Sequence, residues 1–353
     1  MTGRERFLMA LSHKEPDRIP LCDTPWQTTI ARWRREGFPE DRSPHAVFGY
    51  ERTGGGGADL SFQFPAETLE ETDDCKIVKD GWGATTRVFK GQESVPELID
   101  YTVTSREVWE DLKPRYLWND SRVSWEAGLA ANRAACEGDL FVQFAAGFGF
   151  DRVQRMVGMP RVLVAIAEEP EWVKEMMDMT ADLIIHAAEE MIARGFRFDG
   201  AFIWNDQAYR NGPFFSPAAW KELEFPNQKR LCDFFHSKGM PVILHSDGDI
   251  RPLLPMMIEA GHDCIQPCEV KAGMDLVELK KQYGDVLAFM GGIDTRAMAD
   301  PDPAVIEHEI RTKIPVAKAG GGYIYHSDHS VPDNVSLAQY ERVMELVLEC
   351  GAY

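Results

Sequence analysis

The tripeptide His-Ser-Asp occurs twice in this 353-residue chain, each time directly after a short apolar run. The first copy, His245 to Asp247, follows Pro-Val-Ile-Leu, and the second, His326 to Asp328, follows Gly-Tyr-Ile-Tyr. Such runs, bounded by Gly, Pro and Asp, are typical of buried β-strands. Parallel α/β folds place their chemistry at the carboxyl ends of strands. If the two strands share one sheet, imidazoles and carboxylates converge at one edge of it, as a candidate metal site.

The first copy has the spacing of a ligand pair. In an extended strand, the side chains of residues i and i+2 point to the same side, so His245 and Asp247 can both reach one ion. Neutral imidazole and carboxylate suit Zn²⁺, which in catalytic sites keeps one coordination position open. The alternative is that His245 belongs to a buried polar network and Asp247 caps the next helix. Asp249, just before Arg251, is the better cap and leaves Asp247 free.

The second copy offers a third ligand in either of two histidines. His326 and Asp328 share one side of the strand, and His329 begins the following loop. Either histidine would complete a His/Asp/His set, and the other would then support the site by holding a carboxylate. Cys268, after the strand-like run Cys264 to Pro267, is an alternative ligand, although a lone cysteine is more often buried packing.

Further polar and aromatic residues stand near the ends of predicted strands. Asp206 follows the run Gly200 to Trp204 and is interpreted as a general base, a metal ligand or a hydrogen-bond acceptor for substrate. A simple turn is the alternative, because Asn-Asp is a common turn pair. We assign catalytic roles to Asp206, Glu269 and His326. An aromatic-lined mouth would suit an aromatic or macrocyclic ligand, and the predicted substrate contacts are Trp26, Phe148, Trp204, Tyr209 and Gln266.

Strand-like runs alternate with helical patterns over most of the chain, which predicts parallel βαβ units. The clearest helical pattern is Glu171 to Arg194. The strand-like runs are Arg18 to Cys22, Leu140 to Phe144, Gly200 to Trp204, Pro241 to Ser246, Cys264 to Pro267, Leu287 to Met290 and Gly322 to His326. At least seven such strands favour a closed (β/α)8 TIM barrel, and we predict that residues 1–353 form this one domain.

Residues 23–139 read as an irregular elaboration of the barrel, with a hairpin around Lys76 to Phe89. No GxGxxG motif follows a strand, which argues against a dinucleotide-binding sheet. The glycine run Gly54 to Gly57 is interpreted as a flexible loop rather than a phosphate cradle.

Composition narrows the classes of partner and compartment. The formal net charge is −19 and no basic block occurs, which argues against nucleic acid or an anionic membrane surface as the partner. No apolar run has the length of a membrane span, and the N-terminus leads into an amphipathic helix rather than a signal peptide. Seven scattered cysteines suit reduced thiols better than a disulfide framework, so we expect a cytoplasmic protein.

Several motifs resemble the uroporphyrinogen decarboxylase superfamily. They are Arg4-Glu-Arg-Phe7 through His13-Lys-Glu-Pro-Asp-Arg-Ile-Pro20, Ser216-Pro217, His236-Ser-Lys-Gly239, the His245 strand, Gly291-Gly-Ile-Asp294 and His329-Ser-Val-Pro332. The resemblance covers nearly the whole chain and is weakest over residues 23–139. It implies a single TIM barrel and allows a homodimer.

The superfamily contains two well-known functional classes. True uroporphyrinogen decarboxylases have an Arg-rich segment shortly after the first strand. Here that stretch is Cys22-Asp-Thr-Pro-Trp26-Gln-Thr-Thr, so the Arg-rich signature is absent. Cobamide-dependent methyltransferases instead bind zinc through His-x-Cys after one strand and a Cys near the last. The resemblance puts His245 on that histidine, Asp247 on the first cysteine and His329 on the second. Because this placement puts His329 on a ligand position, His329 is preferred to His326. The placement changes the ligand types from sulfur to oxygen and nitrogen.

The expectation is a zinc-dependent methyltransferase that moves a methyl group from a small O-methyl donor to a corrinoid (cobalamin) carried by a partner protein. A His/Asp/His zinc acts better as a Lewis acid on an ether oxygen than as an activator of thiols. Two alternatives remain open. One is a metal-independent decarboxylase of the uroporphyrinogen decarboxylase type acting on a tetrapyrrole or smaller acid, and the other is a non-catalytic tetrapyrrole or corrinoid binder.

Overall fold

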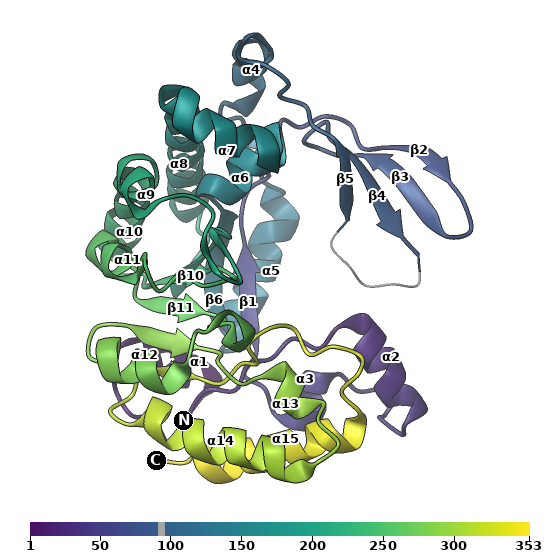
Figure 1. Ribbon diagram of the computed structural model, residues 1–353, viewed down its shortest axis with the longest axis vertical. Helices are drawn as coiled ribbons and strands as arrows, with labels where there is room; N and C mark the ends of the chain where they lie inside the picture. The colour runs from purple at the N-terminus through teal and green to yellow at the C-terminus, as the bar shows by residue number, and fades with distance from the viewer. Residues whose placement is uncertain (91–95) are drawn as a thin grey trace.

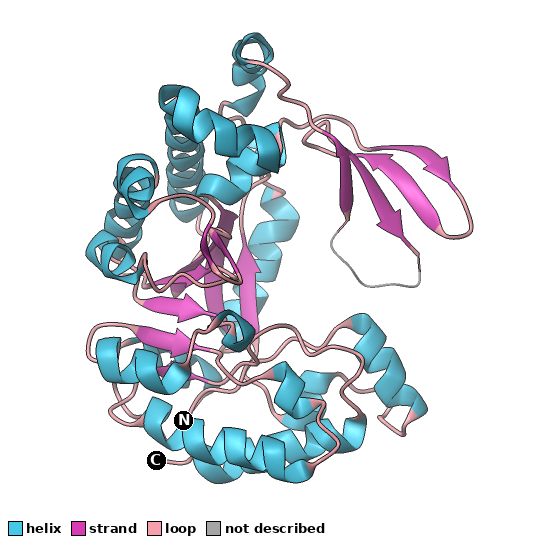
Figure 2. Ribbon diagram, viewed as in Figure 1, coloured by secondary structure: helices cyan, strands magenta, loops and turns pink. Residues whose placement is uncertain are grey.

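The fold is built on a curled, seven-stranded parallel sheet. The computed structural model describes residues 1–90 and 96–353. In spatial order the strands are β1 (Thr53–Gly56), β6 (Phe141–Gly147), β7 (Gly200–Trp204), β10 (Val242–His245), β11 (Cys264–Gln266), β12 (Ala288–Met290) and β13 (Tyr323–Ile324). All neighbouring pairs are parallel, and helices lie around the curled sheet (Figures 1 and 2). Six of the predicted strand-like runs, those from Leu140 onward, are thereby confirmed.

The eighth strand of the predicted closed barrel is not formed as a regular strand among the described residues. The run Arg18 to Cys22 contains only isolated bridges, one of them a parallel bridge from Leu21 to Tyr325. Backbone hydrogen bonds join Cys22 N to Tyr325 O at 3.0 Å and Glu51 N to Leu21 O at 2.8 Å. Pro20 has no N–H to donate, and the N–H of Leu21 donates to Oε2 of Glu51 at 2.6 Å instead of to a strand. The observed architecture is therefore a curled seven-stranded sheet with one bridged segment beside it.

Helices connect the strands and cover the outer face of the sheet. The predicted helix from Glu171 to Arg194 is confirmed within one residue as α8, and Ser216 caps α9 through a hydrogen bond from Ala219 N. The helices are α1 (Gly3–Leu11), α2 (Gln27–Arg35), α3 (Pro44–Phe48), α4 (Arg106–Leu112), α5 (Trp125–Glu137), α6 (Gly149–Val157), α7 (Met159–Glu168), α8 (Pro170–Ala193), α9 (Pro217–Leu223), α10 (Phe225–Ser237), α11 (Leu254–Ala260), α12 (Leu276–Tyr283), α13 (Thr295–Met298), α14 (Pro303–Lys318) and α15 (Leu337–Gly351), with 3-10 turns η1 (Lys113–Tyr116), η2 (Asp120–Arg122) and η3 (Val270–Ala272).

Residues 23–139 contribute more to the sheet than the sequence predicted. The glycine run expected to be a loop is strand β1, paired with β6 from Thr53↔Phe141 to Gly56↔Phe144. A Cβ on Gly57 would lie 2.2 Å from the carbonyl oxygen of Ala145, so close approach of the two backbones requires glycine there. The prediction of a flexible loop was wrong because glycine has low strand propensity but suits tight backbone packing.

The same region carries a separate antiparallel sheet that projects to one side of the molecule (Figure 1). Its order is β2 (Glu67–Glu71), β3 (Cys75–Lys79), β4 (Thr85–Phe89) and β5 (Glu97–Asp100). The β3–β4 pairing, from Cys75↔Phe89 to Lys79↔Thr85, confirms the predicted hairpin. A third, two-stranded sheet pairs β8 (Ala208–Tyr209) with β9 (Gly212–Pro213).

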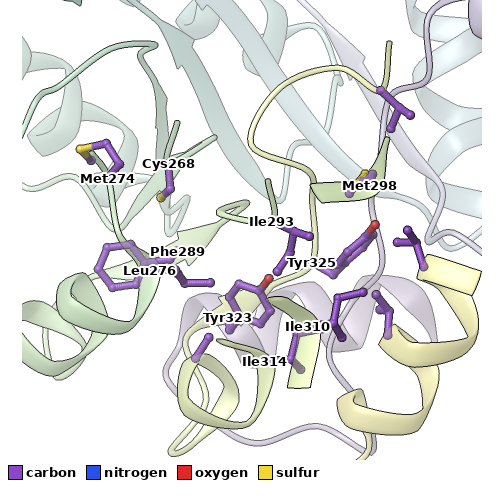
Figure 3. Close-up of a cluster of buried hydrophobic side chains, with 14 of the residues drawn as sticks. Cys268, Met274, Leu276, Phe289, Ile293, Met298, Ile310, Ile314, Tyr323 and Tyr325 are labelled. Atoms are coloured by element: carbon purple, nitrogen blue, oxygen red, sulfur yellow. The ribbon is translucent and has the colours of Figure 1, made fainter. Parts of the chain in front are cut away.

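Alternation along the parallel strands separates an inner core from an outer one. Odd-numbered residues of β10, such as Ile243, face the inside of the curl, where Ile243 packs with Cys264, Ala288 and Ile324. The outer face packs against helices. Figure 3 shows part of this outer core, in which Phe289 and Tyr323 of the sheet lie near α14. Because His245 is two residues after Ile243, the alternation points its side chain into the curl as well.

No helix in residues 1–90 or 96–353 combines the length and apolar character that crossing a membrane requires.

Candidate metal centre and active site

His245 is the last residue of β10 and is held in a defined orientation. It lies in register with Trp204 of β7 and Gln266 of β11, so the three side chains share one face of the sheet. Its Nδ1 is hydrogen-bonded to the amide oxygen of Gln266. That oxygen only accepts, so Nδ1 carries the proton and Nε2 presents its lone pair. Nε2 lies 3.6 Å from Oδ1 of Asp206. The imidazole is thus held in the tautomer that a metal ligand needs.

The loop after β10 is fixed by carboxylates from two neighbouring strand ends. The backbone N–H of Asp247 donates to Oδ1 of Asp206 at 3.0 Å, and that of Gly248 donates to Oε2 of Glu269 at 2.7 Å. Glu269 is also paired with Lys271 at 2.9 Å. Gly248 has φ +87°, and a Cβ there would lie 2.5 Å from the backbone of Ala208. The loop therefore approaches the chain after β7 closely, which brings Asp247 beside Asp206.

Asp206, His245 and Asp247 form a compact group of potential ligands. One ligand atom from each lies within 4.8 Å of the other two. Oδ1 of Asp247 is buried, and no hydrogen bond reaches it from the described residues. A buried acceptor without a partner is unfavourable, and a cation would satisfy it. One imidazole nitrogen and two carboxylates are a donor set that divalent zinc accepts. The residues present therefore fit a zinc ion.

Burial shifts the acidity of three carboxyl groups around this group. Burial raises the pKa of Asp206, and the nearby charge of Asp247 raises it further, while His245 opposes the shift. Burial also raises the pKa of Asp151, which feels the charges of Asp206 and His245. Burial raises the pKa of Glu224 to about 7. Carboxyl groups of this kind can hold a proton near neutral pH, as general acids in active sites do.

A family model described as uroporphyrinogen decarboxylase (URO-D) matches residues 132–350, which is more than half of the chain and includes every member of the ligand group. The chain belongs to the URO-D family. The resemblance found in the sequence motifs is thereby confirmed.

Solved structures extend the match beyond the region that the family model covers. A methyltransferase from Methanosarcina mazei shares the fold of this URO-D family member, with a TM-score of 0.68 and 16% identity over 99% of each chain. At that identity the likeness concerns the fold. A Xaa-Pro dipeptidase with bound methionine in the active site matches 74% of this chain and 66% of its own at 15% identity, and its TM-score of 0.32 is too low to indicate a shared fold. No curated protein sequence matches significantly.

Among the described residues, the two predicted histidines near the last strand lie outside the ligand group. The ring of His329 contacts Trp26 edge-on, with ring centroids 6.0 Å apart. His326 is buried, and its two ring nitrogens lie 2.7 Å from the carbonyl oxygen of Ser327 and 3.3 Å from Oγ1 of Thr24. In this URO-D family member, the third member of the group of potential ligands is Asp206, which follows β7, and not His329, which follows β13.

The other predicted residues divide between the mouth and the core. Trp204 is partly exposed and lines a cavity of about 600 Å³ that also reaches strand β1. Tyr209 is half exposed and its ring stacks on that of Phe214. Phe148 is fully buried in the outer core. Cys268 is also buried, and burial raises the pKa of its thiol to about 12, which suits packing rather than ligation.

Sequence reasoning missed Asp151 and Glu224. Asp151 lies in the first turn of α6, directly after β6, and its N–H donates to Oδ1 of Asn205 at 3.1 Å. The signal that could have found it is its place, since β6 also ends at this edge of the sheet. Glu224 accepts from Phe150 N at 2.6 Å and from Asn205 Nδ2 at 3.2 Å. In the sequence it lies between α9 and α10 and does not follow a strand of the parallel sheet, so no local pattern identifies it.

Proposed function

We propose that this protein is a zinc-dependent methyltransferase that moves a methyl group from a small O-methyl donor to a corrinoid carried by a separate protein. The observation that carries the proposal is the group formed by Asp206, His245 and Asp247, at the carboxyl ends of β7 and β10. The URO-D family membership and the fold shared with a methyltransferase support it. We expect the protein to act in the cytoplasm.

We propose Asp206, His245 and Asp247 as the residues that hold the zinc ion, with Asp206 instead of His329 as the third ligand. Bound there, zinc would supply Lewis-acid polarisation of the donor's ether oxygen. An all nitrogen and oxygen donor set leaves more positive charge on the metal than thiolates do, which favours oxygen donors over thiols as substrates. Gln266 supports the set by fixing the tautomer of His245.

The remaining residues would orient the donor and manage its proton. In the reaction the bond between the methyl carbon and the ether oxygen breaks, its electron pair stays on the oxygen, and the methyl group passes to the corrinoid. The oxygen then takes up a proton. Asp151, a buried carboxyl group with a raised pKa beside Asp206, can supply that proton. Trp204 offers an aromatic wall at the same mouth, and Glu269 holds the loop that carries Asp247.

Metal analysis of protein purified without chelator tests the proposal. We expect about one zinc per chain in the wild type and a large loss in His245→Ala, with Cys268→Ala as the control that keeps its zinc. Absence of stoichiometric zinc from the wild type would contradict the proposal.

A second measurement separates the methyltransferase from the two alternatives. Reduced Co(I) corrinoid protein is mixed with the enzyme and a series of O-methyl compounds, and loss of the Co(I) absorbance is followed. Loss that requires His245 and an O-methyl donor supports methyl transfer. Carbon dioxide release from a tetrapyrrole acid without added metal would support the decarboxylase, and corrinoid binding without turnover would support the binder.

A further inference from the structure

Arg152, in the first turn of α6, is half-buried, and its guanidinium has no hydrogen-bonding partner among the described residues. Its Nε is buried and unpaired, and residues 1–90 and 96–353 give the guanidinium no ion pair within 4 Å, although the charge of the neighbouring Asp151 acts on it. Its Cζ lies 5.3 Å from the ring centre of Trp204 and 5.5 Å from that of Trp82. The aromatic faces attract the cation but leave its in-plane N–H donors unused. Leaving the buried Nε–H donor unpaired is unfavourable.

Two other arginines of the chain use their guanidinium groups within the protein. Arg122 is 2% exposed, and its guanidinium donates to four backbone carbonyl oxygens, those of Asp59, Ser61, Arg115 and Leu117. Arg155, one turn after Arg152 on α6, is paired with Asp80. These two arginines have structural partners already. Arg152 has no comparable partner among the described residues.

The position of Arg152 is prepared by a glycine and borders the ligand group. A Cβ on Gly147, at the end of β6, would lie 2.0 Å from a terminal nitrogen of Arg152, so the guanidinium fits there only because residue 147 has no side chain. Trp204, whose ring it faces, is in register with His245. The preceding residue, Asp151, feels the charges of Asp206 and His245. The free N–H donors therefore lie at the mouth where substrate would bind.

We infer that Arg152 binds a carboxylate of the substrate, so that the donor is a methoxylated carboxylic acid with a planar, aromatic body. This inference rests on the proposed function. A guanidinium matches a carboxylate through two parallel hydrogen bonds, and the flanking tryptophan rings suit a flat ligand. A single negative charge fits better than a phosphate dianion, because Asp151, Asp206, Asp247 and Glu269 lie around the mouth and Arg152 is a cation there with no hydrogen bond or ion pair to the described residues. The carboxylate would bind at Arg152 while the ether oxygen reaches the ligand group.

Binding of benzoate and 4-methoxybenzoate to the full-length protein tests the inference without any methyl transfer. Calorimetric titration with and without added zinc is compared with anisole, which lacks the carboxylate, and with phenyl phosphate. We expect both carboxylates to bind, anisole and phenyl phosphate to bind at least about tenfold more weakly, and Arg152→Gln to weaken benzoate about thirtyfold. A charge-assisted pair of hydrogen bonds has roughly this strength.

Two further variants keep the test decisive. Arg155→Gln, on the same helix but paired with Asp80, should bind benzoate like the wild type. Arg152→Lys keeps the charge but not the planar fork, and should bind about tenfold more weakly, which gives a result even if Arg152→Gln fails to fold. Unchanged benzoate affinity in both Arg152 variants, no benzoate binding by the wild type under either condition, or equally tight anisole binding would overturn the inference. Absence of zinc alone would instead overturn only the proposed function.

Discussion

Both His-Ser-Asp segments begin where a strand of the parallel sheet ends, but their polar atoms are used differently. In the first, Nε2 of His245 faces a carboxylate at 3.6 Å and Oδ1 of Asp247 has no partner among the described residues. In the second, both nitrogens of His326 have hydrogen-bonding partners. The hydroxyl of Ser327 donates to Oδ1 of Asp23 at 2.5 Å.

The second segment joins the chain segments that follow neighbouring strands through hydrogen bonds. Asp328 accepts from Val270 N, Thr295 N and Thr295 Oγ1, each at 3.0 Å. Val270 begins η3 after β11 and Thr295 begins α13 after β12, so one carboxylate joins the segments that follow three neighbouring strands. The same three residue types therefore make a candidate site where His245 Nε2 and Asp247 Oδ1 have no hydrogen bond to the described residues, and a support where the His, Ser and Asp side chains are all hydrogen-bonded. This difference predicts that substitutions in one segment change ligand binding and those in the other change stability.

The largest effect should come from Asp328→Ala. It leaves three donors without an acceptor in a residue position that is 1% exposed, so we expect a loss of about 4 kcal/mol of unfolding free energy, from roughly 1–2 kcal/mol per donor. Chemical denaturation measures it, and zinc content should stay at the wild-type level in the fraction that remains folded. A stable protein with reduced zinc would reverse the roles assigned to the two segments.

Asp247→Ala should have the opposite profile. Removing one of three ligands should lower zinc affinity by about a hundredfold, while the unfolding free energy of the metal-free protein changes by less than about 1 kcal/mol, since an unpaired acceptor is lost. Competition with a chromogenic chelator gives the affinity, and Asp249→Ala, in the same loop, is the control. Equal zinc affinity in both variants would contradict the assignment of Asp247.

The sequence predicted this contrast only in part. Strand ends are marked by apolar runs and bounding residues, so His245 and Asp247 could be placed on one side of one strand end from spacing alone. Asp206 was also a candidate ligand at its own strand end, but spacing alone could not choose it over His329, because the approach of Asp206 to Asp247 depends on Gly248 packing against the chain after β7. Glu224 was missed for a similar reason, since tertiary packing alone brings it to Asn205. Strand β1 was missed because local propensity argues against three consecutive glycines in a strand of four residues.

Glu224 is a buried carboxyl group that accepts a hydrogen bond from Asn205, whose backbone N–H donates to the carbonyl oxygen of His245, and it should make stability depend on pH. The pKa of Glu224 is raised to about 7 from an ordinary 4.5, so the folded state holds a proton that the unfolded state releases. Its stabilising contribution is complete below about pH 4.5 and is lost as pH rises through about 7. Relative to Glu224→Gln, the wild type should lose roughly 2 kcal/mol between pH 5 and pH 7. Denaturation of both proteins at several pH values measures the difference, and a difference independent of pH would remove Glu224 from this role.

The smallest effect should come from the residue that orients His245 without binding metal itself. Gln266→Leu removes the acceptor for Nδ1, so the imidazole can take the other tautomer or rotate, and zinc affinity should fall about tenfold. Gln266→Glu restores an acceptor and should recover most of that loss, which a merely steric role for Gln266 does not predict. The matching change beside the second segment, Thr24→Val, removes the partner of His326 Nε2 and should leave zinc affinity unchanged. If Gln266→Leu and Thr24→Val alter zinc affinity equally, the two segments do not differ in the way that their hydrogen bonds indicate.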